Sequence, residues 1–505
     1  MTFQRASGVL LHPTCLPSRF GIGDLGRSAY EFVDFLEKSG QTLWQVLPLG
    51  PTGYEHSPYI MNFSTFAGNP LLISLESLAE EGLLNSNELE PLPSHDDPAF
   101  ARVDFAQVIP HKFKYLQQAF DRCHHILSSQ SNSAYEQFCQ EQAWWLNDFV
   151  LFMALLEAND YKPWNQWDKA IARRDPDAIA QQTKTLSDRI EFYKFLQFKF
   201  FDQWVKLRAY TNEKNILIVG DVSIYVCHNS ADVWAQPDIF KLNPDTFDPA
   251  FIAGVPPDYF SATGQLWGNP VYDWDKLEQT NFNWWVARFK ATLQYVDIVR
   301  VDHFRGFEAY WQVPGGETTA INGEWIKGPD AKFFEVLESV LGTLPMMAED
   351  LGIITPEVEA LRDRFQFPGM RILQFAFGGG SENSYLPHNY VQNGVVYPGT
   401  HDNDTAIGWW HTAADQEKQH VAKYLGYPSP DQIQEINWEF IRLALGSVAD
   451  LAVIPLQDIL GLDSRARMND PRYNDGQWRW RFTDPALLSE GVSDRLLNLT
   501  QLYRR

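Results

Sequence analysis

Cysteine is scarce in this sequence, and its cysteines lie far apart. The four residues, Cys15, Cys123, Cys139 and Cys227, include no Cys-x-x-Cys pair. This spacing argues against a zinc ribbon and against a dense disulfide framework, so we expect free thiols in a reducing compartment. The sequence also lacks a glycine-rich phosphate loop, a His-Glu-x-x-His motif and an EF-hand pattern. We therefore predict a reaction without a metal or any other cofactor.

Basic residues and long apolar runs are also in short supply. There are 41 Lys and Arg against 64 Asp and Glu, which gives a net charge of −23. Nucleic acids and anionic membrane surfaces need clustered cations, so we predict neither as a partner and expect a neutral substrate. No apolar run reaches about 18 residues, and the N-terminal segment does not have the pattern of a signal peptide. We expect a soluble, cytoplasmic protein, with a plastid stroma left open; a monomer is compatible with the sequence, which does not indicate the oligomeric state.

Aromatic residues, in contrast, are abundant. The chain has 18 Trp, 20 Tyr and 34 Phe. Sugar rings pack their C–H faces on aromatic rings while their hydroxyls bind carboxylates, amides and imidazoles. Most aromatic residues in any large protein belong to its core, so composition alone is only weak support for carbohydrate binding.

The segment 295–307, YVDIVRVDHFRGF, is typical of a short buried strand with candidate catalytic residues at its carboxyl end. Its apolar, mostly β-branched residues give way to charge at Asp302, His303 and Arg305. Alternate residues of a strand share a face, so Arg300 and Asp302 should point the same way. Taken alone, this pattern more often marks an ion pair at a sheet edge than a catalytic site.

Three further apolar runs end in acids. The segments 216–221, 345–350 and 395–402 end at Asp221, at Glu349 with Asp350, and at His401 with Asp402. A single acid of this kind could instead cap a helix. In a parallel α/β barrel, however, all strand ends line one mouth, so acids distant in sequence meet there. The fold class that we predict is therefore α/β, a (β/α)8 TIM barrel with helical and loop insertions.

The remaining patterns divide the chain around this barrel. Residues 27–38 have helical periodicity, and 80–210 is mainly helical, which indicates an insertion or subdomain. We expect 1–79 to begin the catalytic barrel and 211–505 to complete it. Within the latter, 242–273 is rich in Pro, Gly and aromatic residues without periodicity, which predicts an irregular lid-like loop. The expected extended segments are 42–49 as the first barrel strand, 66–75, 216–221, 296–302, 346–349, 370–377, 395–402 and 451–457.

Long blocks of the sequence resemble one enzyme family. They include DIVRVDHFRGFEAYW (297–311), MAEDLGIITPEV (347–358), PGTHDNDT (398–405), WQVLPLGPTGYEHSPY (44–59) and AGVPPDYFSATGQLWGNPVYDW (253–274). These are similar to blocks of the 4-α-glucanotransferases of glycoside hydrolase family 77, called amylomaltases or disproportionating enzymes. The resemblance covers nearly the whole chain and is weakest between about 94 and 209. It implies transfer of α-1,4-glucan segments between maltooligosaccharides on a TIM barrel.

Glycosyl transfer with retention needs an ionised carboxylate as nucleophile and a protonated carboxylic acid, about 5–5.5 Å apart. Arg300 on the same face favours the ionised form of Asp302, and neighbouring carboxylates favour a protonated Glu349. Asp402 could hydrogen-bond sugar hydroxyls more strongly in the transition state. The residues alone leave the roles of nucleophile and acid open. The resemblance implies Asp302 as nucleophile, Glu349 as acid/base and Asp402 as transition-state stabiliser.

The resemblance also implies a set of binding residues. Those that match donor-sugar ligands are Tyr59, Asp221, Asp258, Trp267, Arg300, His303, His401 and Asn469, and Tyr54 matches a residue of a second glucan site. One block departs from the family. Where members commonly have a pattern like NxPGT…NWxWR, this chain has NDPRYNDGQWRWR (469–481). Asn469 and Trp478 are retained but the Pro-Gly turn is not, so the preferred chain length is left open.

Three functions remain open at this stage. The favoured one is an α-1,4-glucan transferase, and the second is an α-glucan hydrolase of related architecture. The third, a non-catalytic saccharide-binding barrel, is disfavoured because all three acids are present. If the 242–273 segment covers the site, Trp267 is a candidate platform that holds an acceptor sugar and excludes water.

Overall fold

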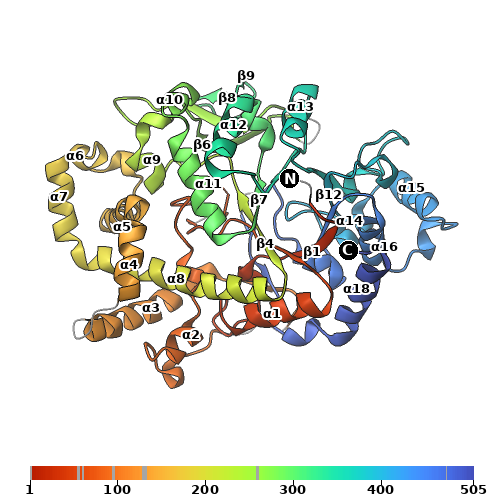
Figure 1. Cartoon of the computed structure of the whole chain (residues 1–505), viewed down its shortest axis with the longest axis horizontal. Coiled ribbons are helices and arrows are strands. Elements are labelled where there is room, and N and C mark those ends of the chain that lie inside the picture. Colours follow the sequence, from red (N-terminus) through yellow and green to blue (C-terminus); the bar gives the residue numbers. More distant parts are fainter. Residues whose placement is uncertain are drawn as a thin grey trace.

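A closed barrel of eight parallel strands forms the centre of the protein. The computed structural model describes residues 3–53, 57–59, 62–93, 97–127, 133–257, 261–473 and 475–505. Around the barrel the strand order is β1-β13-β12-β11-β10-β7-β4-β2 (Figure 1). The predicted TIM barrel is confirmed. Its strands are β1 (Ala6–Leu10), β2 (Leu43–Gln45), β4 (Leu217–Val222), β7 (Ile298–Val301), β10 (Met346–Ala348), β11 (Gly369–Ile372), β12 (Gly394–Tyr397) and β13 (Leu451–Pro455).

Two of the strand predictions were wrong. The first strand is β1, not 42–49, which holds the second strand β2. β1 has a weak signal because it is short and contains Ser7 and Gly8. Gly8 is needed there, since a Cβ at this position would lie 2.2 Å from the Leu43 carbonyl oxygen of β2. The other expected segments, apart from 66–75, each overlap a barrel strand.

The segment 66–75 is not a strand, because local capping overrides its apolar composition. Residues Pro70–Leu72 form a 3-10 turn, in which the Asn69 side chain accepts a hydrogen bond from the Leu71 N–H. Ser74 then caps helix α2 (Leu75–Glu80) by accepting from the Ser77 N–H. These are the side-chain hydrogen bonds that favour turns and helix starts over strands.

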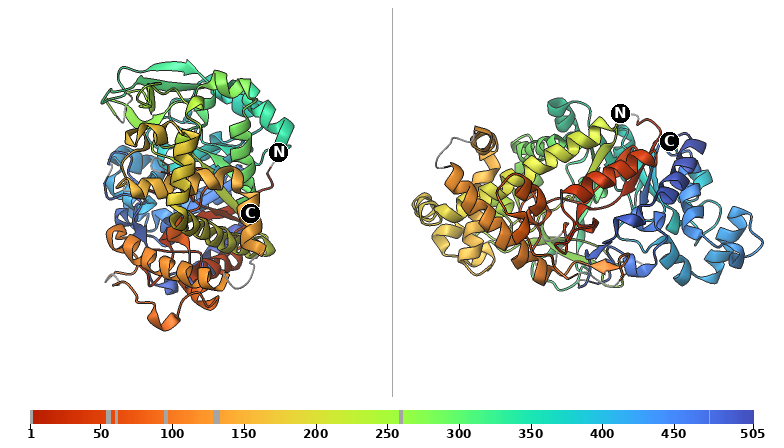
Figure 2. Two further views of the ribbon diagram at one scale, coloured as in Figure 1. Left: turned by 90° about the vertical axis from the view of Figure 1, so that its left-hand side faces the viewer. Right: turned by 90° about the horizontal axis from the view of Figure 1, so that it is seen from below.

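Helices surround the barrel and extend from it (Figures 1 and 2). Helix α1 (Arg27–Lys38) has the predicted bounds. The segment predicted to be mainly helical holds α3 (Phe105–Leu127), α4 (Ser133–Glu141), α5 (Ala143–Ala158), α6 (Lys169–Ala172), α7 (Pro176–Thr185) and α8 (Ser187–Glu213). The others are α9 (Ala231–Ala235), α10 (Trp274–Gln279), α11 (Asn283–Tyr295), α12 (Asp330–Leu341), α13 (Pro356–Arg364), α14 (Ala406–Thr412), α15 (Asp415–Leu425), α16 (Ile436–Gly446), α17 (Leu456–Ile459) and α18 (Glu490–Leu502).

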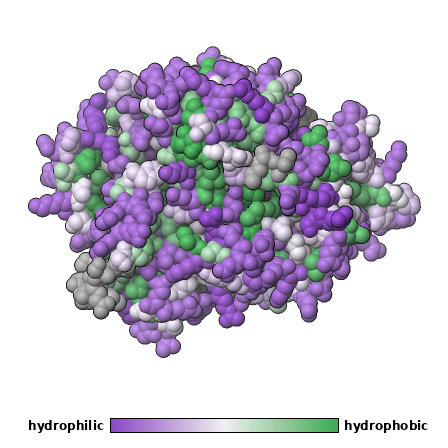
Figure 3. Space-filling view, in the orientation of Figure 1, coloured by the Kyte–Doolittle hydropathy of each residue, from purple (hydrophilic) through white to green (hydrophobic). Residues whose placement is uncertain are grey.

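Much of the aromatic content lies in the core. The largest fully buried side chains include Trp44, Trp204 and Trp285. Charged and polar residues cover most of the face in Figure 3, and apolar residues gather near its centre. Among the described residues, no helix is both long enough and apolar enough to cross a membrane.

A second, antiparallel sheet corrects the expectation of a structureless 242–273 segment. Strands β5 (Phe251–Val255) and β6 (Gln265–Pro270) lie in this segment and pair with β8 (Ala309–Pro314) and β9 (Glu324–Lys327) in the order β6-β5-β8-β9. The partner strand β8 follows the segment 295–307 in the sequence, so local periodicity within 242–273 could not reveal the pairing. A further short pair joins β3 (Ala101–Arg102) to β14 (Trp480–Arg481).

Candidate active site

The ends of β4 and β7 bring a buried arginine together with two carboxylates. Asp221 lies opposite Arg300 in the β4–β7 ladder. The Arg300 Nη1 donates to both oxygens of Asp221 (2.9 and 2.7 Å) and to Asp302 Oδ1 (3.0 Å). Although burial acts to lower it, the carboxylates of Asp221 and Asp302 raise the pKa of Arg300 overall. The predicted shared face of Arg300 and Asp302 is therefore confirmed, and the guanidinium stabilises both carboxylates as anions.

Asp221 connects this ion pair to Tyr59. The Tyr59 hydroxyl donates to Asp221 Oδ2 (2.8 Å), and the Asp221 side chain has no exposed surface. Burial raises the pKa of Asp221, while the Arg300 charge and the Tyr59 hydrogen bond oppose that rise. With a guanidinium at 2.7 Å, we take Asp221 to be the ionised counter-ion of Arg300.

Glu349 stands beside Asp302 because of the strand register. Ala348 pairs with Val301, so the next residues, Glu349 and Asp302, follow on adjacent strands. The Glu349 N–H donates to the Val301 carbonyl (3.0 Å), which extends the ladder to the acid itself. Adjacent strands lie about 4.8 Å apart. That spacing suits the carboxyl separation of about 5–5.5 Å in retaining glycosidases.

The surroundings of Glu349 favour its protonated form. Burial and, to a smaller extent, the charge of Asp302 raise the pKa of Glu349 to about 8, although the charge of Arg300 and hydrogen bonds from two backbone N–H groups oppose the shift. Those donors are His303 N (2.7 Å) and Leu351 N (2.9 Å), which also fix the direction of the carboxyl group. A positioned carboxylic acid that keeps its proton at neutral pH can serve as a general acid.

Asp402 is held by the C-terminal part of the chain. The Asn469 side chain donates to Asp402 Oδ1 (2.6 Å), and Arg467 Nη2 donates to the Asp402 carbonyl oxygen (2.6 Å). The Asn469 N–H donates to the His401 carbonyl (3.0 Å). The Asp402 side chain is still 43% exposed, so it can meet a ligand from the mouth of the barrel. Sequence reasoning missed Arg467, whose only signal is its place two residues before Asn469.

Aromatic rings and two neutral histidines line the site. Tyr59 stacks on His401 at 5.1 Å between ring centroids, and Trp267 meets the His303 ring edge-on at 4.9 Å. Burial lowers the pKa of His303 to about 3 and also lowers that of His401. His303 has a left-handed backbone (φ 51°), and its buried Nε2 has no hydrogen-bond partner among the residues that the structure describes. A strained residue with an unpaired polar atom is the kind of feature that accompanies ligand binding.

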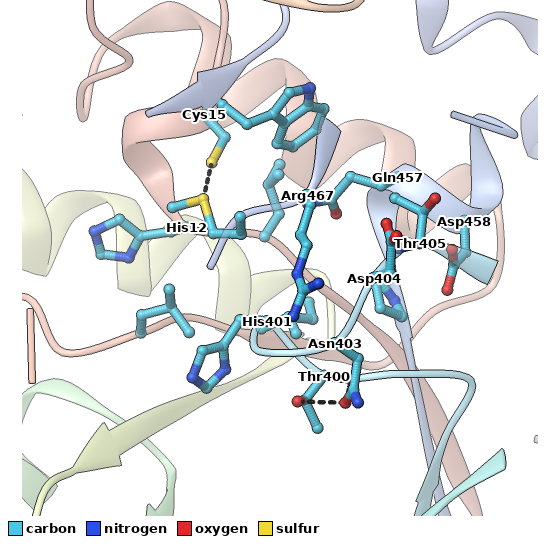
Figure 4. Close-up of a pocket in the computed structure, with 16 residues that line it drawn as sticks. His12, Cys15, Thr400, His401, Asn403, Asp404, Thr405, Gln457, Asp458 and Arg467 are labelled. Atoms are coloured by element: carbon cyan, nitrogen blue, oxygen red, sulfur yellow. Dashed lines mark hydrogen bonds between the residues drawn. The ribbon is translucent and has the colours of Figure 1, made fainter. Parts of the chain in front are cut away.

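A small cavity is lined in part by Thr400, His401 and Asn403 of the segment that follows β12 (Figure 4). Its volume is about 30 Å³, which suits one water molecule and is far too small for a sugar. In its wall the Thr400 hydroxyl donates to Asn403 Oδ1 (2.8 Å), and Asp458 Oδ1 accepts from Ala406 N (2.7 Å) at the start of α14. This cavity is therefore part of the support of the loop and not a binding site for substrate.

The structure brings the described residues of the predicted site together. Asp221, Arg300, Asp302, Glu349, Tyr59, His303, Trp267, His401, Asp402 and Asn469 form one connected set through the contacts above. Tyr54 and Asp258 lie outside the described residues. Within the described residues no group of three His, Cys, Asp or Glu side chains could hold a metal ion. The metal-free reaction stays a prediction.

The sequence did not predict a hydrogen-bonded pair of polar side chains in the barrel interior, Tyr397 and Gln45. The Tyr397 hydroxyl of β12 donates to Gln45 Oε1 of β2 (2.8 Å) across the barrel interior. Both side chains are buried. A lone Gln or Tyr in an apolar strand gives no clue that it faces the barrel interior, so the sequence alone could not assign them.

A parallel barrel with two adjacent carboxyl groups at the carboxyl ends of its strands, one bound to a guanidinium and one buried, is an arrangement found in barrel enzymes that act on glycosidic bonds. The sequence matches the profile of the 4-alpha-glucanotransferase family over residues 11–487. It is 53% identical to a 4-alpha-glucanotransferase of Synechocystis sp. over 507 residues, covering 100% of this chain and 99% of that protein. A 4-alpha-glucanotransferase of Thermus thermophilus is 46% identical, with 100% of both chains covered.

The fold gives the same result. The solved amylomaltase from Streptococcus agalactiae in complex with acarbose matches with a TM-score of 0.94 and 37% identity, covering 99% of this chain and 100% of that one. The chain therefore belongs to the 4-alpha-glucanotransferase family. It is an enzyme of α-1,4-glucan transfer, as the resemblance predicted.

Proposed function

We propose that this protein is a retaining 4-α-glucanotransferase that acts through a covalent glycosyl-Asp302 intermediate. It moves α-1,4-glucan segments from a donor maltodextrin to the 4-hydroxyl of an acceptor glucose or glucan. The observation that carries this proposal is the pair formed by Asp302 and Glu349. Asp302 is hydrogen-bonded to the Arg300 guanidinium, whereas burial keeps Glu349 protonated at neutral pH.

In the first step, the Asp302 carboxylate attacks the anomeric carbon of the donor. The bond from that carbon to the glycosidic oxygen breaks, and the Glu349 proton passes to the departing oxygen. A shorter glucan then leaves with a free 4-hydroxyl. In the second step the acceptor 4-hydroxyl attacks the same carbon, Glu349 takes its proton, and the bond to Asp302 breaks. Two inversions give net retention, and the enzyme returns to its starting state.

The other residues of the site position the sugar and stabilise charge. Asp402 hydrogen-bonds sugar hydroxyls, and these bonds strengthen in the oxocarbenium-like transition state. His303 and His401 are neutral, so each can donate a hydrogen bond to one ring hydroxyl and accept a hydrogen bond from another. Asp221 and Arg300 act by holding Tyr59 and Asp302 in place. We assign Asp258 to the donor site and Tyr54 to a second glucan site on the family resemblance alone.

We propose maltooligosaccharides and α-1,4-glucans as the substrates. The S. agalactiae amylomaltase was solved with acarbose, which supports this class. We also propose a cytoplasmic location; the rice and potato relatives are named chloroplastic/amyloplastic proteins, so a plastid stroma is the alternative. Fractionation of the source cells distinguishes the two.

The product ladder from maltotriose tests the proposed function. We expect shorter and longer maltooligosaccharides, some long enough to cyclise, with little net gain in reducing ends. A large gain in reducing ends would favour the α-glucan hydrolase instead. The covalent step is tested by acid-quenching the enzyme during turnover of an α-glucosyl fluoride and digesting it. A glucosyl mass on the peptide that contains Asp302 supports the mechanism, and the same mass on another peptide would overturn the assignment.

A further inference from the structure

The described residues 469–473 and 475–478 form an arch whose two ends both reach the active site. At one end Asn469 donates to Asp402 Oδ1 (2.6 Å), and at the other the Trp478 ring lies 5.6 Å from the Tyr59 ring. The Trp478 N–H donates to the Met468 carbonyl (2.8 Å), which closes the base of the arch. Both ends are buried, whereas 471–473 are exposed. The arch therefore stands at the rim of the site.

Trp478 at the base of the arch is buried, whereas Tyr473 in its outer part is 61% exposed. One exposed tyrosine is ordinary on a protein surface. Tyr473 differs from other exposed tyrosines because it lies on the arch beside the active site and because hydrogen bonds and a neighbouring cation hold its turn. Its N–H donates to the Asp470 carbonyl (3.0 Å), and its ring lies 5.6 Å from the Arg472 guanidinium carbon. The ring is thus presented on a short turn beside a cation.

The same ion pairs hold the arch and the loop of Asp402. Asp470 accepts two hydrogen bonds from Arg472 (2.9 and 2.6 Å) and pairs with Arg467 at 3.0 Å. Arg467 also donates to the Asp402 carbonyl oxygen. A glucan lying over the arch would therefore sit at a fixed place relative to Asp402, because Arg467 holds both the arch and the loop that carries Asp402.

We infer that Tyr473 and Arg472 form a rim subsite that binds a glucose unit of the glucan at a distance from the bond that is broken. This inference rests on the proposed function. The C–H face of a glucose unit would pack on the Tyr473 ring, and the guanidinium would donate to its hydroxyls. The arch is also where the sequence departs from the family pattern, since Arg472 follows Pro471 in place of glycine. The rim subsite would give this enzyme a chain-length preference of its own.

Donor length is the variable that tests the rim subsite. We compare kcat/KM for maltotriose and maltoheptaose in the wild type, Tyr473→Ala and Tyr473→Phe. One lost aromatic contact corresponds to about a two- to tenfold loss. We expect Tyr473→Ala to lose that much on maltoheptaose, through a higher KM, and clearly less on maltotriose. Tyr473→Phe keeps the ring and should keep the wild-type ratio of the two donors.

Two controls separate binding from disturbance of the site. Tyr161→Ala removes a tyrosine of similar exposure, 46%, that follows α5 in the helical segment, and should leave the ratio of the two donors unchanged. The alkaline limb of the pH profile should also stay in place in Tyr473→Ala, because Asp302 and Glu349 are untouched. Equal losses on both donors, or a Tyr473→Phe variant as poor as Tyr473→Ala, would overturn the rim subsite. A wild type that makes no product ladder would instead overturn the proposed function.

Discussion

The two sides of the active site are held in different ways. Asp302 and Glu349 follow directly on paired strands, and the main-chain ladder continues to Glu349 itself. Asp402 lies five residues beyond the end of β12 and is fastened by the side chains of Asn469 and Arg467. The hydrogen bonds of a ladder are between main-chain groups, so most single substitutions leave them in place. A hydrogen bond from a side chain is lost when that one side chain is substituted. Substitutions around Asp402 should therefore reduce activity by degrees, whereas on the other side the largest losses should come from the two acids and from Arg300, which binds Asp302.

The largest effect is expected from Asp302→Asn. The amide cannot form the covalent bond to the anomeric carbon, so transfer from maltotriose should fall by at least about 10⁴-fold. Asp494→Asn, an exposed aspartate on α18, is the matched control and should be as active as the wild type. Initial rates of glucose release from maltotriose provide the measurement. Turnover within tenfold of the wild type would show that Asp302 is not the nucleophile.

Glu349→Gln should come next, with a loss that depends on the leaving group. Without the acid, release of a sugar oxygen should slow by about 10²- to 10⁴-fold. Fluoride departs without a proton, so an α-glucosyl fluoride should lose much less in the first step. The comparison uses burst or single-turnover rates with both donors, and Glu490→Gln on α18 is the control. Equal losses with the two donors would mean that Glu349 is not the proton donor.

The raised pKa of Glu349 also links activity and stability to pH. Activity needs the protonated acid, so the rate should fall as the pH rises through about 8. The folded protein binds this proton more tightly than the unfolded chain, whose pKa is near the usual 4.5. The free energy of unfolding should therefore decline from about pH 4.5 to about pH 8 on account of this group. Glu349→Gln should be more thermostable than the wild type at pH 8; an unchanged or lower Tm there would contradict the raised pKa.

The contrast between the two sides also explains what could be predicted from the sequence. Apolar runs that end in acids are local patterns, and together they indicated the barrel and the site formed by Asp302, Glu349 and Asp402. Arg467 reaches Asp402 from 65 residues away, and nothing near it in sequence marks that contact. Strands β5 and β6 were missed for the same reason. Strand β8, which pairs with β5, lies more distant in the sequence, after the segment 295–307. Neither the partner of a non-local side-chain contact nor the partner of a strand can be read from the local periodicity of a single sequence.

A moderate effect is expected from Asn469→Ala. The substitution removes the hydrogen bond to Asp402 Oδ1 and leaves a carboxylate that can turn, so Asp402 should stabilise the transition state less well. A hydrogen bond to a charged group contributes about 1.5–3 kcal/mol, which corresponds to about a 10- to 100-fold loss. The loss should appear mainly in kcat. Asn498→Ala on α18 is the control, and a less than twofold change in Asn469→Ala would show that Asp402 does not depend on this contact.

The smallest effect, and the most specific, is expected from Trp267→Ala. After the glycosyl-Asp302 intermediate forms, water and an acceptor hydroxyl compete for the same carbon. Water is present at about 55 M, but an aligned acceptor can reach an effective molarity of about 10⁵ M or more, so transfer dominates only while the acceptor is well held. Trp267 meets His303 at 4.9 Å from strand β6, next to the nucleophile, where a sugar would cover the intermediate.

The hydrolysed share of the product should therefore rise about two- to tenfold in Trp267→Ala, while consumption of the donor falls less. The same sheet offers a control. Trp325 of β9 pairs with Trp311, which shares a face with Gly254 and Leu266, so Trp325 lies on the face opposite Trp267. Trp325→Ala should leave the ratio of hydrolysis to transfer at the wild-type value. If Trp267→Ala slows both reactions in equal proportion, the ring contributes to donor binding alone, and water is excluded by another part of the site.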